Sequence, residues 1–477
     1  MPFLSRAGAG DTAMPKWPSH QQEEAVQNAM FVPDAHLEEL IFGYCRERLR
    51  EPVPLDFPGR KAPIDAALSG LMSPGGNDPV KVLRLFTEEL ATAVISCDSP
   101  RFLAFIPAAP TKAALLFDMV VSCSSLQGTS WLEAAGAVAA ENQALGVLAD
   151  VAGLPAGAGG CFVSGGSAGN LSALVVARDV ARHRRGAAAV GQPLVAVSDQ
   201  AHSSIAKALH VAGMDALVVK ARDHRLDGPR LSDALDADAD PASVVAVVAT
   251  AGTTNAGIVD DLRGVGEVAA ARDLWFHVDA AYGGAALFAP SVRERFDGTD
   301  LADSFVVDPH KWLFAPFDCA ALLYRAPHLA KAVFTQDAAY LDVIHTGRPE
   351  EWNPSDYAYH LTRRARGLAL WFSLAVHGTD AYRDAVEAVL TVTREAAALI
   401  AGAPHLELIR EPELSIVLFR RPGWTADDYA RWSSQLLADQ VAFVASTSWE
   451  GEAVARLAFL HPGTTVDVVA EIIATMA

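Results

Sequence analysis

Short apolar runs recur through the middle of the chain, and polar or glycine-rich sequence follows each of them. The runs are apolar nearly throughout, without regular polar interruptions, which indicates strands that are covered on both faces. Helical stretches separate the runs, so the pattern predicts an α/β unit with a mainly parallel central sheet and helices on both faces. The predicted strands lie at residues 161–164, 194–198, 243–250, 275–279 and 304–308.

The two flanks of this region follow other patterns. Before it, apolar residues at spacings of three and four predict helices over residues 33–90, divided by a proline-rich joint. After it, helical patterns at residues 368–377 and 382–401 precede short apolar runs, which predict a small α+β unit. Those runs lie at residues 413–420, 441–445 and 455–460. We therefore expect an N-terminal helical segment over residues 1–95, a large domain over 96–372 and a small C-terminal domain over 373–477.

Composition narrows the class of protein. The chain has 477 residues, more than a single hydrophobic core usually serves, which agrees with several units. Its 38 basic and 57 acidic residues give a net charge of −19, which disfavours nucleic acid and anionic membranes as partners. The five cysteines include no Cys-x-x-Cys pair, so we expect no bound metal, no disulfide framework and a cytoplasmic location. No apolar run is long enough to predict a signal peptide or a membrane span.

Two ionisable residues stand at the ends of predicted strands. Lys311 follows the last of them, and the apolar residues after it indicate a desolvated amine, which suits Schiff-base chemistry. Asp279 ends the preceding strand, where a buried carboxylate needs a partner such as the protonated ring nitrogen of pyridoxal phosphate. Each has an ordinary alternative, since a single lysine is usually a solvated surface residue and an aspartate often caps a turn.

Three further loops follow strands in the same way. Gly166 and Ser167 lie between a strand and a helix, an arrangement whose free N–H groups bind phosphate, although a plain tight turn is an alternative. His202 can stack on a ring or transfer a proton, or be an ordinary core histidine. Thr253 lies in a polar loop that is either a ligand contact or a simple turn. Because ligands bind beyond the carboxyl ends of parallel strands, the five features together indicate one site in a cofactor-binding domain.

Three segments resemble a known family. Residues 198–204 (SDQAHSS), 277–284 (HVDAAYGG) and 308–313 (DPHKWL) are similar to the group II pyridoxal-phosphate-dependent amino-acid decarboxylases, which include aromatic-L-amino-acid, tyrosine, histidine and glutamate decarboxylases. The likeness runs from about residue 99 to the C-terminus and is weaker over the N-terminal helices. It implies the aspartate-aminotransferase-type fold (fold type I), pyridoxal 5'-phosphate as cofactor, and a homodimer with active sites at the subunit interface.

The resemblance also implies roles for individual residues. Lys311 is expected to form the Schiff base and Asp279 to hold the pyridine nitrogen. His202 is expected to stack on the cofactor ring, and Tyr340 to return a proton to the substrate carbon after carbon dioxide leaves. The remaining cofactor contacts are expected from Gly166, Ser167, Thr253, Ala281 and His310.

The expected substrate pocket departs from that of aromatic-amino-acid decarboxylases. Thr129 stands where those enzymes carry a phenylalanine that lines the pocket, and Thr362 replaces a glycine or serine. Phe105 and Ile106 keep an apolar wall, and Arg456 resembles an arginine near the substrate carboxylate. We therefore expect a small-molecule substrate, a hydrophobic or aromatic L-amino acid.

Two outcomes are compatible with this scaffold. The first is simple decarboxylation to the amine and carbon dioxide. The alternative is oxidative decarboxylation–deamination to an aldehyde, in which relatives often replace the loop tyrosine by phenylalanine or the stacking histidine by asparagine. Tyr340 and His202 are both present here, which favours the amine. The same intact residues argue against a non-catalytic relative that only binds a ligand.

Overall fold

The computed structural model describes residues 28–106, 108–238, 240–336, 338, 341–345 and 351–477. Two sheets organise these residues, and the larger has seven strands in the order β1-β7-β6-β5-β4-β2-β3. Its strands are β1 (Gly159–Val163), β2 (Leu194–Ser198), β3 (Asp215–Val219), β4 (Val244–Thr250), β5 (Trp275–Asp279), β6 (Ser304–Val307) and β7 (Ala320–Tyr324). Strands β3, β2, β4, β5 and β6 pair in parallel, and β7 pairs antiparallel with both β6 and β1. The expected mainly parallel sheet is therefore confirmed, with β7 running opposite to its neighbours.

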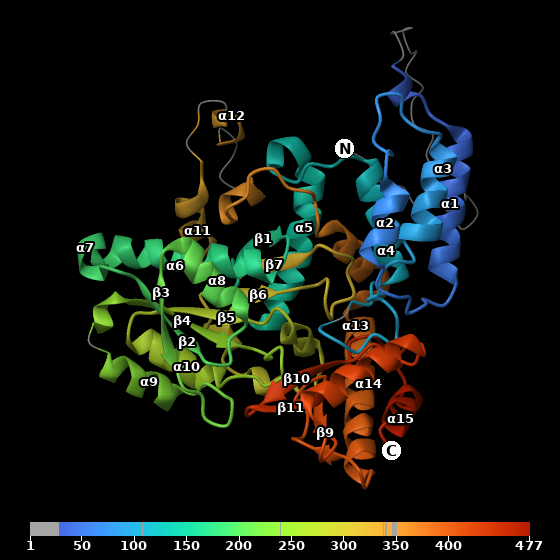
Figure 1. Cartoon of the computed structure of the whole chain (residues 1–477). Helices are drawn as coiled ribbons and strands as arrows, with labels where there is room; N and C mark the ends of the chain where they lie inside the picture. The colour runs from blue at the N-terminus through green and yellow to red at the C-terminus, as the bar shows by residue number, and fades with distance from the viewer. Residues whose placement is uncertain (1–27, 107, 239, 337, 339–340, 346–350) are drawn as a thin grey trace.

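Helices cover both faces of this sheet, as the unbroken apolar runs predicted. Figure 1 shows α6 (Gly166–Arg185) and α8 (Ser203–Ala212) above the strands, with α9 (Gly228–Ala237) and α10 (Leu262–Ala271) below them. Neighbouring residues of a strand enter different cores: Val195 and Val197 pack with α6 and α8, whereas Ala196 packs with α9 and α10. This burial on both sides accounts for the lack of polar residues within the strands.

A smaller antiparallel sheet forms the C-terminal unit, in the order β10-β11-β9-β8. Its strands are β8 (Glu407–Leu408), β9 (Ile416–Arg420), β10 (Ala445–Trp449) and β11 (Glu452–Ala458). The strand expected at residues 441–445 is displaced, because Phe443 pairs through its backbone with Arg101 and Leu103 instead of joining this sheet. The α+β character of the unit is as expected.

The remaining helices connect and flank the two sheets. They are α1 (Ala35–Arg50), α2 (Lys61–Leu68), α3 (Pro79–Arg84), α4 (Lys112–Cys123), α5 (Trp131–Ala152), α7 (Ala187–Val190), α11 (Pro327–Phe334), α12 (Asp342–His345), α13 (Leu368–Gly402), α14 (Ala426–Ala438) and α15 (Val466–Ala474). Short 3₁₀ segments lie at η1 (Ala29–Phe31), η3 (Pro241–Ser243), η4 (Gly283–Phe288), η5 (Arg293–Phe296), η6 (Thr299–Leu301) and η7 (Pro354–Tyr357), and a π-helical segment at η2 (Leu85–Leu90).

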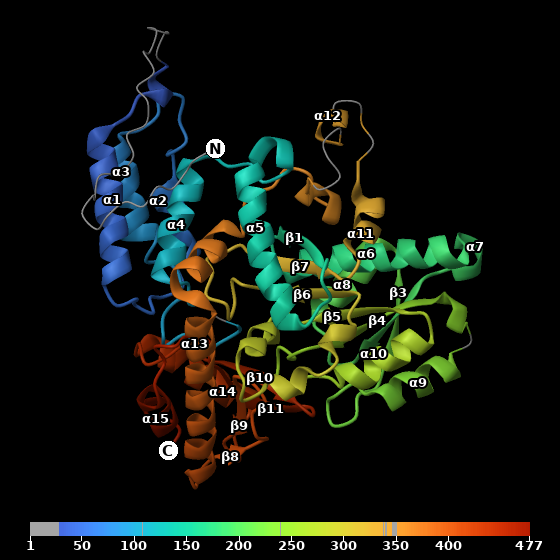
Figure 2. The same ribbon diagram turned by 180° about the vertical axis from the view of Figure 1, so that it is seen from behind.

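Helix α13 joins the two sheet-containing units. It crosses the boundary expected after residue 372 and kinks at Gly378, whose φ of 74° suits a residue without a Cβ. That kink separates the two helical patterns recognised in the sequence. Figure 2 shows α1, α2 and α3 as a column beside the body of the chain, next to α4. Within the part of the chain that the structure describes, no helix is long and apolar enough to span a membrane.

Candidate active site

A cavity of about 470 Å³ opens at the carboxyl ends of the parallel strands β4, β5 and β6. Backbone hydrogen bonds hold these strand ends together, from Ala251 N–H to the Asp279 carbonyl and from Asp308 N–H to the Ala281 carbonyl. The expected site residues that line the cavity are Phe105, Ile106, Gly166, Ser167, His202, Asp279, Ala281, His310 and Lys311. Residues from well-separated parts of the sequence therefore meet in one place, as in other parallel sheets.

Lys311 reaches the cavity from the turn after β6. Its Nζ lies 2.9 Å from Oδ2 of Asp308, a carboxylate that is 2% exposed. The other oxygen, Oδ1, has no hydrogen-bond partner among the described residues. His310 lies beside this pair, with Nε2 3.8 Å from Oδ2 of Asp308 and Nδ1 2.7 Å from the carbonyl oxygen and 3.1 Å from the nitrogen of Cys319. Burial lowers the pKa of His310, so the amine has a neutral ring and a buried anion as neighbours.

Asp279 supplies a second buried carboxylate at the end of β5. It is 5% exposed, and its oxygens accept the Ala281 N–H at 3.1 Å and an Nδ2 hydrogen of Asn170 at 2.9 Å. Both donors are neutral, and within the described chain no lysine or arginine forms an ion pair with it. A buried carboxylate in such a setting suits a cationic ligand group, and a protonated pyridine nitrogen is one.

The start of α6 forms another side of the cavity. Gly165 and Gly166 open the helix directly after β1, and the N–H groups of a helix start, together with the helix dipole, favour a phosphate. A Cβ on Gly166 would lie 3.0 Å from both the Ala281 Cβ and Oδ2 of Asp308, so the chain passes here too closely for a larger residue. Lys311, Asp279 and this helix start together fit the aldehyde, ring nitrogen and phosphate of pyridoxal phosphate.

His202 stands at the N-cap of α8 and lines the same cavity. Its Nδ1 accepts the Ser204 N–H at 3.2 Å and lies 2.9 Å from the Ser204 Oγ. Because a nitrogen that accepts a backbone N–H carries no hydrogen, the proton of the neutral ring sits on Nε2.

Four of the expected residues do not line the cavity. Thr253 is 4% exposed and its Oγ1 accepts the Ile258 N–H at 3.1 Å, so it braces the loop whose neighbours Gly252 and Thr254 reach the cavity. Thr129 and Thr362 lie elsewhere, on two chain segments that meet where the Gly128 N–H donates to the Arg363 carbonyl at 2.9 Å. The fourth is Arg456, and the expected catalytic residue Tyr340 lies outside the described residues.

Arg456 is buried against the backbone behind the cavity. Its guanidinium donates to the carbonyls of Phe105 at 2.8 Å, Thr254 at 2.6 Å and Asn255 at 3.2 Å. Burial lowers its pKa to about 10. The arginine therefore ties β11 to two loops that border the cavity, and its three main-chain contacts leave only part of its hydrogen-bonding capacity for a ligand.

The sequence alone did not single out several residues of the cavity wall. They include Asn170, Ser204, Tyr282 and Asp308. Asn170 lies one helical turn after Gly166, a spacing that places both on one face of α6. The other three belong to the segments that carry the family resemblance, so their position next to recognised residues was the available signal.

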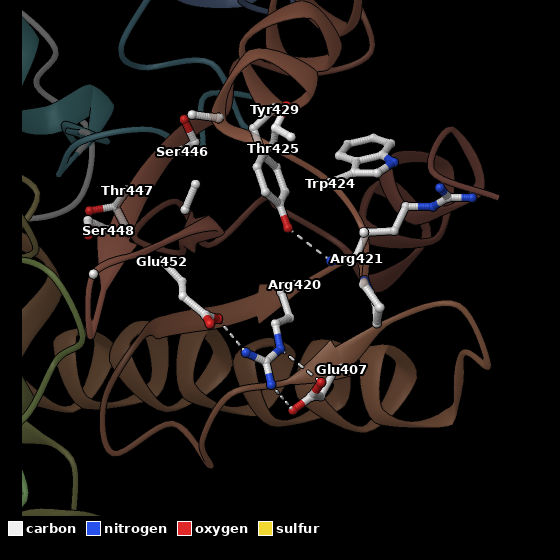
Figure 3. A pocket seen from close by; sticks show the side chains of 15 residues that line it. Glu407, Arg420, Arg421, Trp424, Thr425, Tyr429, Ser446, Thr447, Ser448 and Glu452 are labelled. Carbon is white, nitrogen blue, oxygen red and sulfur yellow. Dashed lines mark hydrogen bonds and ion pairs between the residues drawn. The ribbon is translucent and has the colours of Figure 1, made fainter.

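A larger groove of about 810 Å³ lies in the C-terminal unit, but its charged side chains are less available to a ligand. Figure 3 shows Arg420 pointing between Glu407 and Glu452, and its guanidinium donates to the two carboxylates at 2.6 to 2.8 Å. The charges that line this groove are largely paired with one another. In the described part of the chain, no group of three or more His, Cys, Asp or Glu side chains could hold a metal ion.

Comparison with known proteins agrees with a pyridoxal-phosphate site in the cavity at the ends of β4, β5 and β6. Residues 64–421 match the model of the pyridoxal-dependent decarboxylase conserved domain. An aromatic-L-amino-acid decarboxylase from Bacillus atrophaeus is 30% identical over 83% of this chain and 84% of its own length. An L-2,4-diaminobutyrate decarboxylase from Rhizobium meliloti is 34% identical over 76% of this chain and 74% of its own length. The crystal structure of Oryza sativa TDC with PLP and tryptamine superimposes with a TM-score of 0.83 and 27% identity, covering 92% of this chain and 96% of that one.

The match covers most of the chain, and it includes the strands and loops that form the cavity. The expected fold type I architecture, the pyridoxal 5'-phosphate cofactor and the amino-acid decarboxylase activity are thereby confirmed. The chain belongs to the pyridoxal-dependent decarboxylase family.

Proposed function

We propose that the substrate is an aromatic or other hydrophobic L-amino acid, which the enzyme converts to the amine and carbon dioxide. The observation that carries this proposal is the composition of the cavity, where Lys311 and Asp279 face a space bordered by Phe105 and Ile106. An apolar wall beside the reactive groups suits an uncharged side chain. The relatives named aromatic-L-amino-acid decarboxylase and tryptophan decarboxylase support the same class of substrate.

We propose that the residues of the cavity hold the cofactor at separate points. Lys311 would bond its aldehyde, Asp279 would hold its ring nitrogen, and His202 and Ala281 would lie against the ring. Gly166 and Ser167 at the start of α6 would hold the phosphate, with Thr253 bracing the neighbouring loop and His310 packing beside the lysine. When bound, pyridoxal phosphate supplies an electron sink for the electron pair of the breaking bond.

The side chains around the cofactor would hold and transfer the protons that the reaction needs. The Asp308 carboxylate, 2.9 Å from Nζ of Lys311, would keep the amine beside the place where it acts. His202, with Nδ1 already occupied by Ser204, presents an Nε2 hydrogen as a donor toward a substrate carboxylate or the reacting carbon. Tyr340, which lies outside the described residues, stays the proposed proton donor. Arg456 would act on the substrate carboxylate mainly by fixing the loops at Phe105 and Thr254.

A panel of L-amino acids tests the substrate proposal. Purified protein loaded with cofactor is incubated with each common L-amino acid, DOPA, 5-hydroxytryptophan and L-2,4-diaminobutyrate, and carbon dioxide, amine, aldehyde and peroxide are measured together. The diamino acid is included because of the relative named for it. We expect the highest kcat/KM with an aromatic substrate and one amine for each carbon dioxide. A clear preference for the diamino acid would contradict the proposed substrate class.

The aldehyde-forming alternative gives a distinct result in the same assay. A 4-hydroxyphenylacetaldehyde synthase from Rhodiola rosea is also similar, with 29% identity over 71% of this chain. We expect no peroxide, because His202 is present and occupies the cavity wall. Aldehyde together with peroxide would show that the alternative describes this enzyme.

We also propose that the enzyme is a homodimer with sites shared between subunits. Within the described helices α1, α2 and α3 no residue is buried, and large apolar side chains of this region and of the adjoining segment stay exposed. They include Phe42, Phe57, Met72, Phe86, Leu116 and Leu132. Such an exposed apolar surface marks an interface. Thr362, which is exposed and does not line the cavity of its own chain, would face that of the second subunit, whereas Thr129 is buried within its own chain.

Light scattering during size-exclusion chromatography tests the assembly. We expect a mass near twice that of the 50.5 kDa chain. Phe86→Glu and Leu116→Glu, which place charges on the exposed apolar surface, should shift the enzyme toward the monomer and reduce activity. A monomeric wild-type enzyme with full activity would contradict the proposal.

A further inference from the structure

Asn170 lies in the cavity wall, at the centre of a buried chain of hydrogen bonds. Its side chain is on α6 and only 1% of the residue is exposed. Its Nδ2 donates one hydrogen to Oδ2 of Asp279 at 2.9 Å and the other to the Ser204 Oγ at 3.1 Å. Its Oδ1 lies 2.9 Å from Nε2 of His277. Both hydrogens and the oxygen of the amide therefore have partners.

The state of His277 determines how this amide is oriented. The ring is fully buried, and burial lowers its pKa to about 4, so it is neutral and carries one hydrogen near pH 7. Its Nδ1 lies 2.8 Å from the Ser304 Oγ, which also accepts the indole N–H of Trp275 at 2.8 Å. Ser304 is fully buried, and within the described chain its hydroxyl has no other partner, so its own hydrogen is donated to Nδ1. The ring hydrogen is left on Nε2, where it donates to Oδ1 of Asn170.

The opposite orientation of the amide is excluded by the same contacts. A reversed amide would place Oδ1 against the acceptor oxygen of Asp279 and Nδ2 against the hydrogen on Nε2 of His277. Each of these contacts would pair two acceptors or two donors in a buried place, which is costly. Asn170 is thus held with its donor side toward Asp279 and its acceptor side toward His277.

We propose that Asn170 is a positioning residue that, locked by His277, fixes the Asp279 carboxylate in place and aims it into the cavity. The hydrogen bond that fixes the carboxylate comes from a neutral amide, so it does not compete with a cationic ligand for the carboxylate. The inference rests on the proposed role of Asp279 as the partner of the cofactor ring nitrogen. It adds Asn170 and His277 as the residues that position the Asp279 carboxylate for this contact.

The experiment measures the affinity of the apoenzyme for pyridoxal phosphate, by titration followed through the absorbance of the bound cofactor. Asn170→Leu keeps the size of the side chain and removes all three hydrogen bonds. We expect its Kd to rise about tenfold, which corresponds to about 1.4 kcal/mol. Ser172→Ala is the matched control, because Ser172 lies on the same helix, is equally buried and takes no part in the network. We expect its Kd to stay at the wild-type value.

Two variants of His277 show whether the effect passes through the amide. His277→Gln retains an N–H donor for Oδ1 of Asn170, whereas His277→Leu does not. We expect the glutamine variant to bind cofactor nearly as well as the wild type and the leucine variant to bind it severalfold more weakly. If Asn170→Leu does not fold, the comparison of these two His277 variants still tests the proposed role of Asn170. Equal affinity in the two His277 variants, or an unchanged Kd in Asn170→Leu, would overturn the proposal.

Asp279→Asn separates this inference from the proposed function on which it rests. If Asp279→Asn weakens cofactor binding but Asn170→Leu does not, the role of Asp279 stands and that of Asn170 is wrong. If Asp279→Asn itself leaves the Kd unchanged, the proposed role of Asp279 is wrong, and the inference falls with it. Neither result depends on the identity of the amino-acid substrate, because no turnover is measured.

Discussion

The ion pair between Glu141 and Arg363 is a sharp test of how the structure supports the site. The two side chains are 2% and 1% exposed, and their charged ends meet in a bidentate contact at 2.7 and 2.8 Å. The carboxylate also accepts the Gly367 N–H at 2.8 Å, and the guanidinium donates to the Gly128 carbonyl at 2.5 Å. The pair therefore joins α5 to the chain segments that carry Thr129 and Thr362.

Glu141→Gln removes the negative charge and keeps the size of the side chain. The guanidinium of Arg363 then stays in the interior without a counterion, while the amide oxygen can still accept the Gly367 N–H. Removing one partner of a buried ion pair costs about 3–5 kcal/mol, because the remaining charge is desolvated and uncompensated. We expect the variant to lose about 3 kcal/mol of unfolding free energy, at the lower end of that range, since the glutamine preserves part of the hydrogen bonding.

Urea unfolding followed by circular dichroism measures this loss on the cofactor-loaded enzyme. Arg383→Gln serves as the control, because Arg383 pairs with Asp380 and Asp384 on the surface, where water screens the charges. We expect no measurable change in the control. A loss below about 1 kcal/mol in Glu141→Gln would refute the reasoning, because it would mean that the buried guanidinium is solvated or neutralised in another way.

Three further predictions concern the cavity and the pH dependence of stability. Gly166→Ala places a Cβ 3.0 Å from an oxygen of Asp308 and should raise the Kd of pyridoxal phosphate about tenfold in the absorbance titration. Gly146→Ala is the control, because its Cβ meets no atom within 4 Å, and it should leave this Kd unchanged. Burial raises the pKa of Asp260 to about 7, so this group stabilises the fold most at low pH, and its contribution is lost as the pH rises from about 4 to 7. When the unfolding free energy is measured by urea unfolding as a function of pH, Asp260→Asn should reduce the change between about pH 4 and 7. Burial lowers the pKa of His277 to about 4, so the contribution of this residue to the unfolding free energy is present above pH 6.5 and is lost as the pH falls toward 4. If urea unfolding showed a stability that rises as the pH falls from 6.5 to about 4 in the wild type but not in His277→Gln, the direction of this effect would be wrong.

The sequence by itself determined the class of sheet and the cofactor, and it predicted that the proposed site residues gather at one edge of the sheet. Strands buried on both faces leave a local pattern of unbroken apolar residues, and this pattern is legible without tertiary contacts. In a parallel sheet the carboxyl ends lie on one edge, so residues such as Asp279 and Lys311, which stand at or shortly after strand ends, were expected to meet. They do meet, in the cavity beyond β5 and β6.

Only the tertiary structure decided which neighbours these residues have and which expected residues turn away. Asn170 and Asp279 are 109 positions apart, and their hydrogen bond depends on the packing of α6 against β5. Thr253 and Arg456 were expected at the cofactor and substrate, but backbone groups of the surrounding loops hold their side chains outside the cavity wall. Local periodicity reports burial, whereas the direction of a polar side chain depends on donors and acceptors that only the folded chain brings near it.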